Sequence, residues 1–212
     1  MIRRTVLFAF LLASTIAIAQ TPKVESIGPF SGSGAPAAVV NVLEAKGYRI
    51  PGLADIWFAK SVAETGKSDP ATTIYPKLDS SAFVGVITFT GPAKDFRGQP
   101  IRPGTYIMRY EKLPTDGNHM GVAPDPDFVL LTLLADDSDP AAAHKYEQLT
   151  KLSAKAAGSN HPVSFSLAPT DRAESFPSTF LNDEGHMIFA AKIKTASGEM
   201  PFGIVLKGQA AQ

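Results

Sequence analysis

The densest group of side chains with chemical potential lies between residues 116 and 127, just before a long apolar run. Its polar members are Asp116, Asn118, His119, Asp125 and Asp127. An imidazole can act as a general base or bind a metal, and a neighbouring carboxylate can orient the ring or share the metal. One hypothesis is therefore a small hydrolase or metal-dependent enzyme centred on this loop.

Arg109 precedes this group on a predicted strand and could bind an anion or a carboxylate. The interpretation that we favour for the whole group is structural: Asp116-Gly117 forms a hairpin turn, while Asn118 and His119 bond to the loop backbone. Arg109 then pairs with an acid on a neighbouring strand. The candidate binding residues are Arg109, Asp116, Asn118, His119, Asp125 and Asp127. We assign no catalytic residue and no cofactor. We assign no metal ligand either, because a metal site needs three or four ligands and one hairpin offers two.

Two other groups of polar residues are candidates for a binding site. His119 and His186 are the pair of histidines most suited to a shared site. The acidic run Asp136, Asp137 and Asp139 lacks the glycine and the distal glutamate of a calcium-binding loop. It is better explained as the entrance of a helix, where acids favour the positive end of the dipole.

The first nineteen residues have the three parts of an export signal. Arg3 and Arg4 precede an apolar run over residues 6–18, and Ala17 and Ala19 supply the small residues that signal peptidase needs. The apolar run is shorter than the roughly 20 residues of a spanning helix. We therefore expect cleavage before Gln20, no stable membrane insertion after cleavage, and a periplasmic or secreted protein.

The composition narrows the domain organisation and the partners. The chain has 212 residues with 20 basic and 20 acidic side chains, and removal of residues 1–19 leaves 18 basic against 20 acidic. Such a balance gives no electrostatic reason to bind nucleic acid. The chain contains no cysteine, and its length suits a single domain. We expect a flexible tether over residues 20–36, one domain over 37–207 and a tail over 208–212.

Hydrophobic periodicity predicts a mainly-β fold with two short helices. Alternating or continuous apolar residues predict strands over residues 53–60, 83–89, 105–110, 128–134, 163–167, 187–193 and 202–206. Helical patterns cover residues 36–46, which Gly47 would end, and residues 140–157, which Gly158 would end. Trp57 is expected in the core. Strands with short connections favour an antiparallel β-sandwich of immunoglobulin- or transthyretin-like type.

Two segments carry a resemblance to known proteins. Residues 101–106 read IRPGTY and residues 116–119 read DGNH, and both resemble segments of uncharacterised exported proteins of soil bacteria. The first segment is also similar to strand edges in fibronectin- and transthyretin-like modules. The resemblance covers residues 47–134 and implies a sandwich fold, but it implies no activity, cofactor or catalytic residue.

These observations lead to three functional hypotheses. The leading one is a non-catalytic binding or accessory module of the bacterial envelope. The alternatives are the hydrolase or metal-dependent enzyme centred on the 116–127 loop, and a subunit of an envelope assembly that recruits a protein partner.

Overall fold

The structure is a computed structural model that describes residues 21–66, 73–113 and 126–208. Ten strands share one large sheet: β1 (Glu25–Ile27), β2 (Gly47–Ile50), β3 (Ala54–Phe58), β4 (Phe83–Phe89), β7 (Gly104–Lys112), β8 (Asp127–Leu133), β9 (Ser164–Ala168), β10 (Ser178–Leu181), β11 (Met187–Thr195) and β12 (Gly198–Lys207). The other elements are a two-stranded pair, β5 (Ala93–Lys94) and β6 (Pro100–Ile101), and two helices, α1 (Ala37–Val42) and α2 (Tyr146–Ala157).

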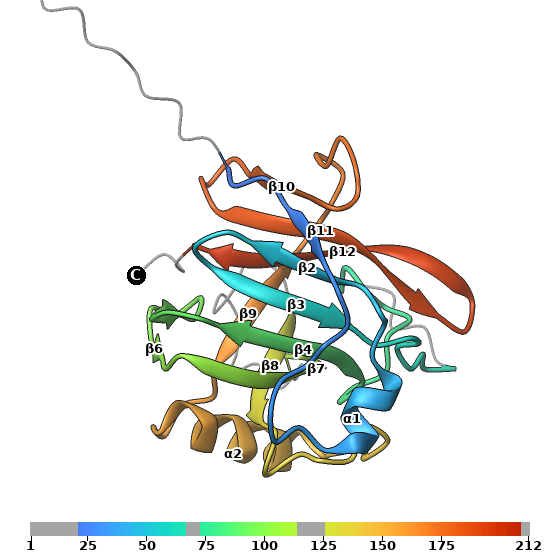
Figure 1. The fold of residues 1–212 in the computed structure, drawn as a ribbon, viewed down its shortest axis with the longest axis vertical. Helices are drawn as coiled ribbons and strands as arrows, with labels where there is room; N and C mark the ends of the chain where they lie inside the picture. Colours follow the sequence, from blue (N-terminus) through green and yellow to red (C-terminus); the bar gives the residue numbers. More distant parts are fainter. Residues whose placement is uncertain (1–20, 67–72, 114–125, 209–212) are drawn as a thin grey trace, which may run out of the picture.

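The large sheet is antiparallel throughout and has the order β1-β2-β3-β4-β7-β8-β9-β12-β11-β10 (Figure 1). The prediction of a mainly-β antiparallel fold with two short helices is confirmed. β4 has the predicted bounds, and β8 is buried at nearly every position, as its continuous apolar run indicates. The strands belong to one continuous sheet, which curls into a half-barrel.

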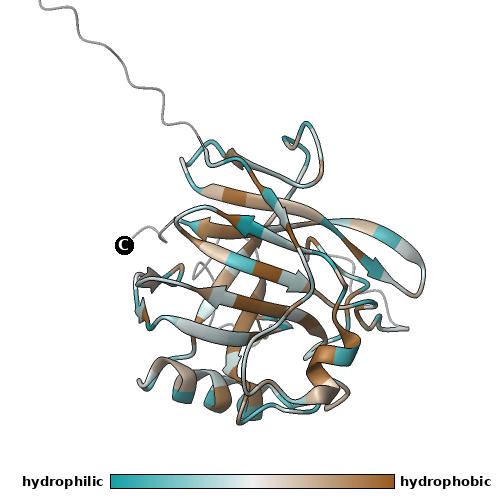
Figure 2. Ribbon diagram, viewed as in Figure 1, coloured by the Kyte–Doolittle hydropathy of each residue, from teal (hydrophilic) through white to brown (hydrophobic). Residues whose placement is uncertain are grey.

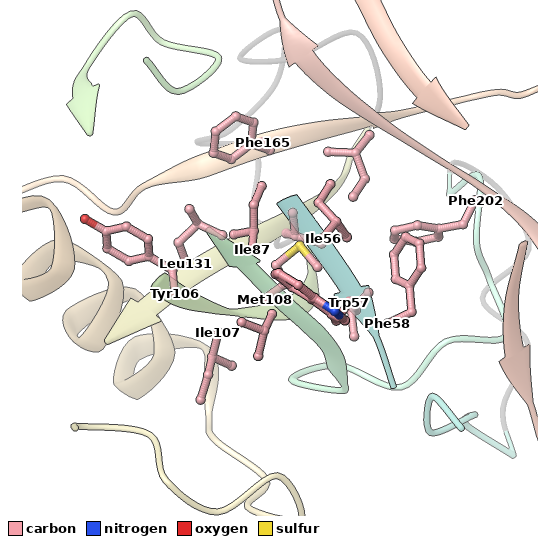
Figure 3. Close-up of a cluster of buried hydrophobic side chains, with 14 of the residues drawn as sticks. Ile56, Trp57, Phe58, Ile87, Tyr106, Ile107, Met108, Leu131, Phe165 and Phe202 are labelled. Carbon is pink, nitrogen blue, oxygen red and sulfur yellow. The ribbon is translucent and has the colours of Figure 1, made fainter. Parts of the chain in front are cut away.

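Aromatic side chains fill the space between the two halves of the curled sheet. Phe58 on β3 stacks on Phe189 of β11 with ring centres 6.2 Å apart, and meets Phe202 of β12 edge-on at 6.1 Å. Figure 3 shows Phe58 and Phe202 side by side at one end of the buried cluster. Rings at such distances attract each other beyond their buried area. β2 and β3 therefore pack against β11 and β12, although the sheet order separates them widely.

Helix α2 covers the outer face of β8. Leu149 is fully buried against Phe128 and Leu130, and hydrophilic and hydrophobic residues alternate along the helix (Figure 2). Ser153 also ties the helix to the sheet, because its hydroxyl bonds both backbone groups of Val163. Neither α1 nor α2, the two helices of the described residues, has the length and apolar character needed to cross a membrane.

Both predicted helices are shorter than expected. α1 ends at Val42, and Gly47 begins strand β2 instead of ending a helix. α2 begins at Tyr146 and not near residue 140, because Arg109 draws the carbonyl oxygens of Asp139 and Ala142 toward its guanidinium. A helix would need those oxygens as acceptors for its own N–H groups. Gly158 does end α2, with a left-handed φ of 65°.

Part of the segment that we expected to be a tether packs on the sheet. Glu25–Ile27 pairs with β2, and Phe30 is buried with its ring 5.0 Å from that of Trp57. The indole of Trp57, which is buried as predicted, donates a hydrogen bond of 2.8 Å to the carbonyl of Gly28. The Thr179 hydroxyl on β10 also donates to the carbonyl of Pro22. This segment therefore contacts both ends of the sheet.

Among the glycines of the described residues, Gly85 is the one whose added Cβ would come closest to another backbone atom. Its φ is 152°, and an added Cβ would overlap the carbonyl oxygen of Trp57 and lie 2.9 Å from the Cα of Phe58. The pairing of β4 with β7 shifts register at the same place, between Phe83 and Gly85. Only a residue without a side chain fits this bulge.

Gly85→Ala should therefore destabilise the protein by about 2 kcal/mol or more, because overpacking and strain at positive φ act together. The matched control is Gly91→Ala, since nothing lies within 4 Å of a Cβ at Gly91. The control should stay within about 0.5 kcal/mol of the parent protein. Urea unfolding measures both variants, and equal stability of the two would contradict this account of the bulge.

Candidate functional site

Arg109, the first candidate binding residue, is fully buried on β7 and uses every N–H group of its guanidinium within the protein. Nε and Nη2 donate to the two carboxylate oxygens of Asp137 at 2.9 and 2.6 Å. Nη1 donates to the carbonyls of Ser81 and Ala142, and Nη2 donates also to that of Asp139. Five donors thus meet five acceptors, and none remains for a ligand.

Asp137 is equally saturated. Besides Arg109, the Thr132 hydroxyl donates to Oδ2 at 2.7 Å, and Nε2 of His144 lies 3.1 Å from Oδ1. Burial alone would raise the pKa of Asp137, but the hydrogen bonds and charge of Arg109 outweigh it and hold the pKa below its usual value. The Arg109–acid pair that we expected is present, although the acid lies in the loop after β8.

Asp127, the other candidate within the described residues, is buried at the start of β8. Its Oδ2 accepts the backbone N–H of Ile74 at 2.7 Å, and its Oδ1 accepts the N–H of Tyr75 at 3.2 Å. The Tyr110 hydroxyl lies 2.5 Å from Oδ1. Burial, and then this hydrogen bond, raise the pKa of Tyr110, so the hydroxyl stays protonated and donates. Asp127 fixes residues 74–75 to the sheet.

Tyr75 extends this connection to the far side of the half-barrel. Its hydroxyl donates to the carbonyl of Ala168 on β9 at 3.0 Å and accepts the N–H of Gly203 on β12 at 2.7 Å. The ring lies 4.9 Å from that of Phe202. Asp127 therefore belongs to a buried network that joins β7, β8, β9 and β12.

The remaining candidates, Asp116, Asn118, His119 and Asp125, lie outside the described residues, and so does the partner expected for His186. His186 itself packs edge-on against Phe96, with ring centres 5.3 Å apart. No group of three or more His, Asp or Glu side chains within residues 21–66, 73–113 and 126–208 is arranged to hold a metal ion.

His186 borders a hollow of about 260 Å³ on the outer face of β9 to β12, which we call the outer groove. Its floor is apolar and includes Phe96, Ile188 and Val205. The polar groups at its rim are held by one another, since Arg172 binds Asp183 at 2.6 Å and Asn182 accepts the N–H of His186. The outer groove therefore offers apolar surface with a self-paired rim.

A second hollow, of about 250 Å³, lies where the two halves of the sheet meet, and we call it the seam cleft. Its lining includes Lys46, Tyr48, Phe58, Phe176, Lys192 and Lys194. Lys194 Nζ binds Glu44 across the seam at 2.9 Å, and the N–H of Val62 donates to the carbonyl of Lys194. The curl of the sheet thus gathers one site from segments about 150 positions apart.

Tyr48 lines the seam cleft, and the charges of Glu44, Lys194 and Glu199 act on its hydroxyl. Its ring lies 5.7 Å from Phe189 and 6.0 Å from Phe58. Burial, and next the charge of Glu44, raise the pKa of Tyr48, so the hydroxyl is a proton donor at neutral pH. Within the described residues this hydroxyl has no hydrogen-bond partner.

The lysines of the seam cleft differ in how they are paired. Lys194 binds Glu44, whose hydrogen bond raises the lysine pKa, and Lys192 lies 3.7 Å from Glu199. The ammonium of Lys46 sits 5.4 Å from the ring centre of Tyr48, and no carboxylate of the described chain pairs with it. The cleft thus combines aromatic walls, one net positive charge and two donors for which the described residues supply no acceptor.

Sequence reasoning missed the seam cleft. One signal was available on β11, where Lys192 and Lys194 alternate with buried Ala191 and Ile193 and so mark two neighbouring exposed cations. The contribution of Tyr48 was hidden, because the pattern around Gly47 predicts the end of a helix.

No family model, curated protein or solved structure matches this chain.

Arg109→Met should destabilise the protein by about 3–5 kcal/mol at pH 7, because it leaves Asp137 buried without its cation. An unpaired buried carboxyl has a raised pKa, so the loss should shrink as the pH falls toward 4. In the parent protein the pKa of Asp137 is lower in the folded state than in the unfolded chain. The buried pair therefore stabilises the fold fully above the unfolded pKa, and this stabilisation is lost as the pH falls through the folded pKa. Urea unfolding at pH 7 and pH 4 measures both effects.

The control for this variant is Arg172→Met, which breaks an ion pair with Asp183 whose two side chains are 49% and 91% exposed. Water replaces much of a surface pair, so this variant should lose far less stability and show little change with pH. Equal losses for the two variants, or a loss at Arg109 that is independent of pH, would contradict the structural role of the buried pair.

Asp127→Asn should lower the melting temperature whether or not zinc is present. The amide keeps only one acceptor oxygen for three donors, which costs about 2 kcal/mol and about 4–8 °C in a domain of this size. A metal site in the 116–127 loop predicts instead that zinc raises the melting temperature of the parent protein but not that of the variant. Zinc at 100 times its dissociation constant would add about 2.7 kcal/mol to the parent protein, and Asp127→Asn would abolish that gain. Thermal scans with and without zinc distinguish the two.

Proposed function

We propose that this protein is an exported, non-catalytic binding module of the bacterial envelope and that the seam cleft is its ligand site. The observation that carries the proposal is the meeting of aromatic walls and unengaged donors at Tyr48 and Lys46 in one hollow. Ligand sites combine apolar walls with a few polar groups that fix orientation in this way.

The lining of the seam cleft supports binding over catalysis. Its polar side chains are lysines, glutamates and one tyrosine, and the described lining holds no serine, threonine or histidine that could form a nucleophile–base pair. Arg109 and Asp127, on which the enzyme hypothesis relied, are engaged in buried structural bonds. Export is supported by the charged, apolar and small-residue segments within residues 1–19.

Titration of the ¹⁵N-labelled protein with single-ring fragments and monosaccharides tests this proposal. The fragments should include neutral, cationic and anionic members. Shift changes should concentrate on the backbone amides of residues 44–48, 58–59 and 192–194, because these segments line the cleft. Tyr48→Ala should abolish the changes, and every fragment should be recovered unaltered.

The matched control is Phe180→Ala, which truncates a ring in the outer groove and leaves the seam cleft intact. Its response to the fragments should equal that of the parent protein. Shift changes confined to the outer groove, no change with any compound, or chemical conversion of a fragment would each overturn the proposed function.

A further inference from the structure

The ligand class of the seam cleft follows from the polar groups that the protein leaves unused there. Both glutamates face lysines, with Glu44 bound to Lys194 and Glu199 near Lys192. Within the described residues, the groups without an acceptor are the ammonium of Lys46, which contacts only the Tyr48 ring, and the hydroxyl of Tyr48. Both are donors, and an ammonium has no acceptor capacity. The matching group on a ligand is therefore an acceptor, and one excess cation favours an anion.

The walls and size of the seam cleft define the rest of the ligand. Tyr48, Phe58 and Phe176 present aromatic surface, and Pro177 adds a flat apolar wall beside them. Aromatic rings pack on such surfaces in offset or edge-on geometry. A cavity of about 150 Å³ holds benzene. The volume of about 250 Å³ therefore has room for one ring and one polar substituent.

We propose that the seam cleft binds a single-ring aromatic carboxylate, oriented by Lys46 and Tyr48. The carboxylate accepts hydrogen bonds from the Lys46 ammonium and the Tyr48 hydroxyl, while the ring packs against Phe176 and Pro177. A carboxylate bonded to a charged donor gains about twice the strength of a neutral hydrogen bond. This inference rests on the proposed function and adds the chemistry of its ligand.

The charges of the cleft also favour a carboxylate over a cation or a neutral amide of the same size. A cation would have to approach Lys46 and Lys194, and a neutral amide would leave the Lys46 ammonium without an anionic partner. A cation that enters the cleft would also compete with Lys194 for Glu44. Specificity thus arises from repulsion of the wrong charge as well as attraction of the right one.

The experiment titrates the full protein with benzoate, benzamide, benzylamine and acetate by nuclear magnetic resonance or calorimetry. Benzamide keeps the ring without the charge, benzylamine reverses the charge, and acetate keeps the carboxylate without the ring. Benzoate should bind at least about tenfold more tightly than each of the others. Its affinity should fall as salt is added, because the charged rim is exposed.

Variants of Lys46 and Tyr48 then test whether these two side chains donate hydrogen bonds to the carboxylate. Lys46→Met and Tyr48→Phe should each weaken benzoate binding by about fivefold or more while leaving benzamide binding nearly unchanged. Lys46→Arg should retain most of the benzoate affinity, because it keeps the charge. Lys151→Met, which removes an exposed lysine on α2 far from the cleft residues in the sequence, should behave as the parent protein.

Each outcome decides between the two proposals. Equal affinity for benzamide and benzoate, or benzoate binding that both variants leave unchanged, overturns the aromatic carboxylate and leaves the cleft as a binding site if other fragments still perturb it. Absence of benzoate binding while a sugar or a cation perturbs residues 44–48 likewise overturns the aromatic carboxylate alone. Absence of any response at these residues removes the ligand class and the proposed function together.

Discussion

A guanidinium excluded from water must find an acceptor for each of its five N–H groups, and this requirement at Arg109 shapes one end of the molecule. The acceptors come from three places: the turn before β4, the Asp137 carboxylate after β8, and the loop before α2. The loop over residues 139–145 consequently bends around the cation instead of forming a helical turn. The start of α2, and thus how this helix lies on β8, depends on a charge located on β7.

Tyr110, the residue next to Arg109 on β7, points to the opposite face of the sheet and belongs to a second buried network. Tyr75 bonds β9 and β12, while Asp127 holds the backbone of residues 74–75 against β7 and β8. Phe58 stacks on Phe189 and meets Phe202 edge-on, and these contacts hold the two halves of the sheet against each other. The seam cleft lies beside these rings, because Phe58 and Tyr48 belong both to its lining and to this aromatic cluster.

The sequence contains enough information to locate most central strands but not the site. β4 and β8 are predictable because alternation and an unbroken apolar run depend only on local burial. The start of α2 cannot be predicted in this way, because Arg109 donates hydrogen bonds to the carbonyls of Asp139 and Ala142, which a helix over residues 139–145 would need for itself. β1, β2 and β10 carry too few apolar residues to show a period. The seam cleft requires knowledge of which strands face each other, since Lys46 and Lys194 meet only through the curl of the sheet.

The contacts of Thr21 and Pro22 with Thr179 bear on the order in which the chain can fold. The partners are 158 and 157 positions apart, so the loop that they close spans almost the whole described chain. Closing so long a loop has a large entropic cost, and contacts of this separation form late. The β2–β3 hairpin and the pairing of β11 with β12 involve short separations and can form early. The contacts of Thr21 and Pro22 with β10 are therefore expected to form later than the pairing of β1 with β2, which joins residues about 20 positions apart.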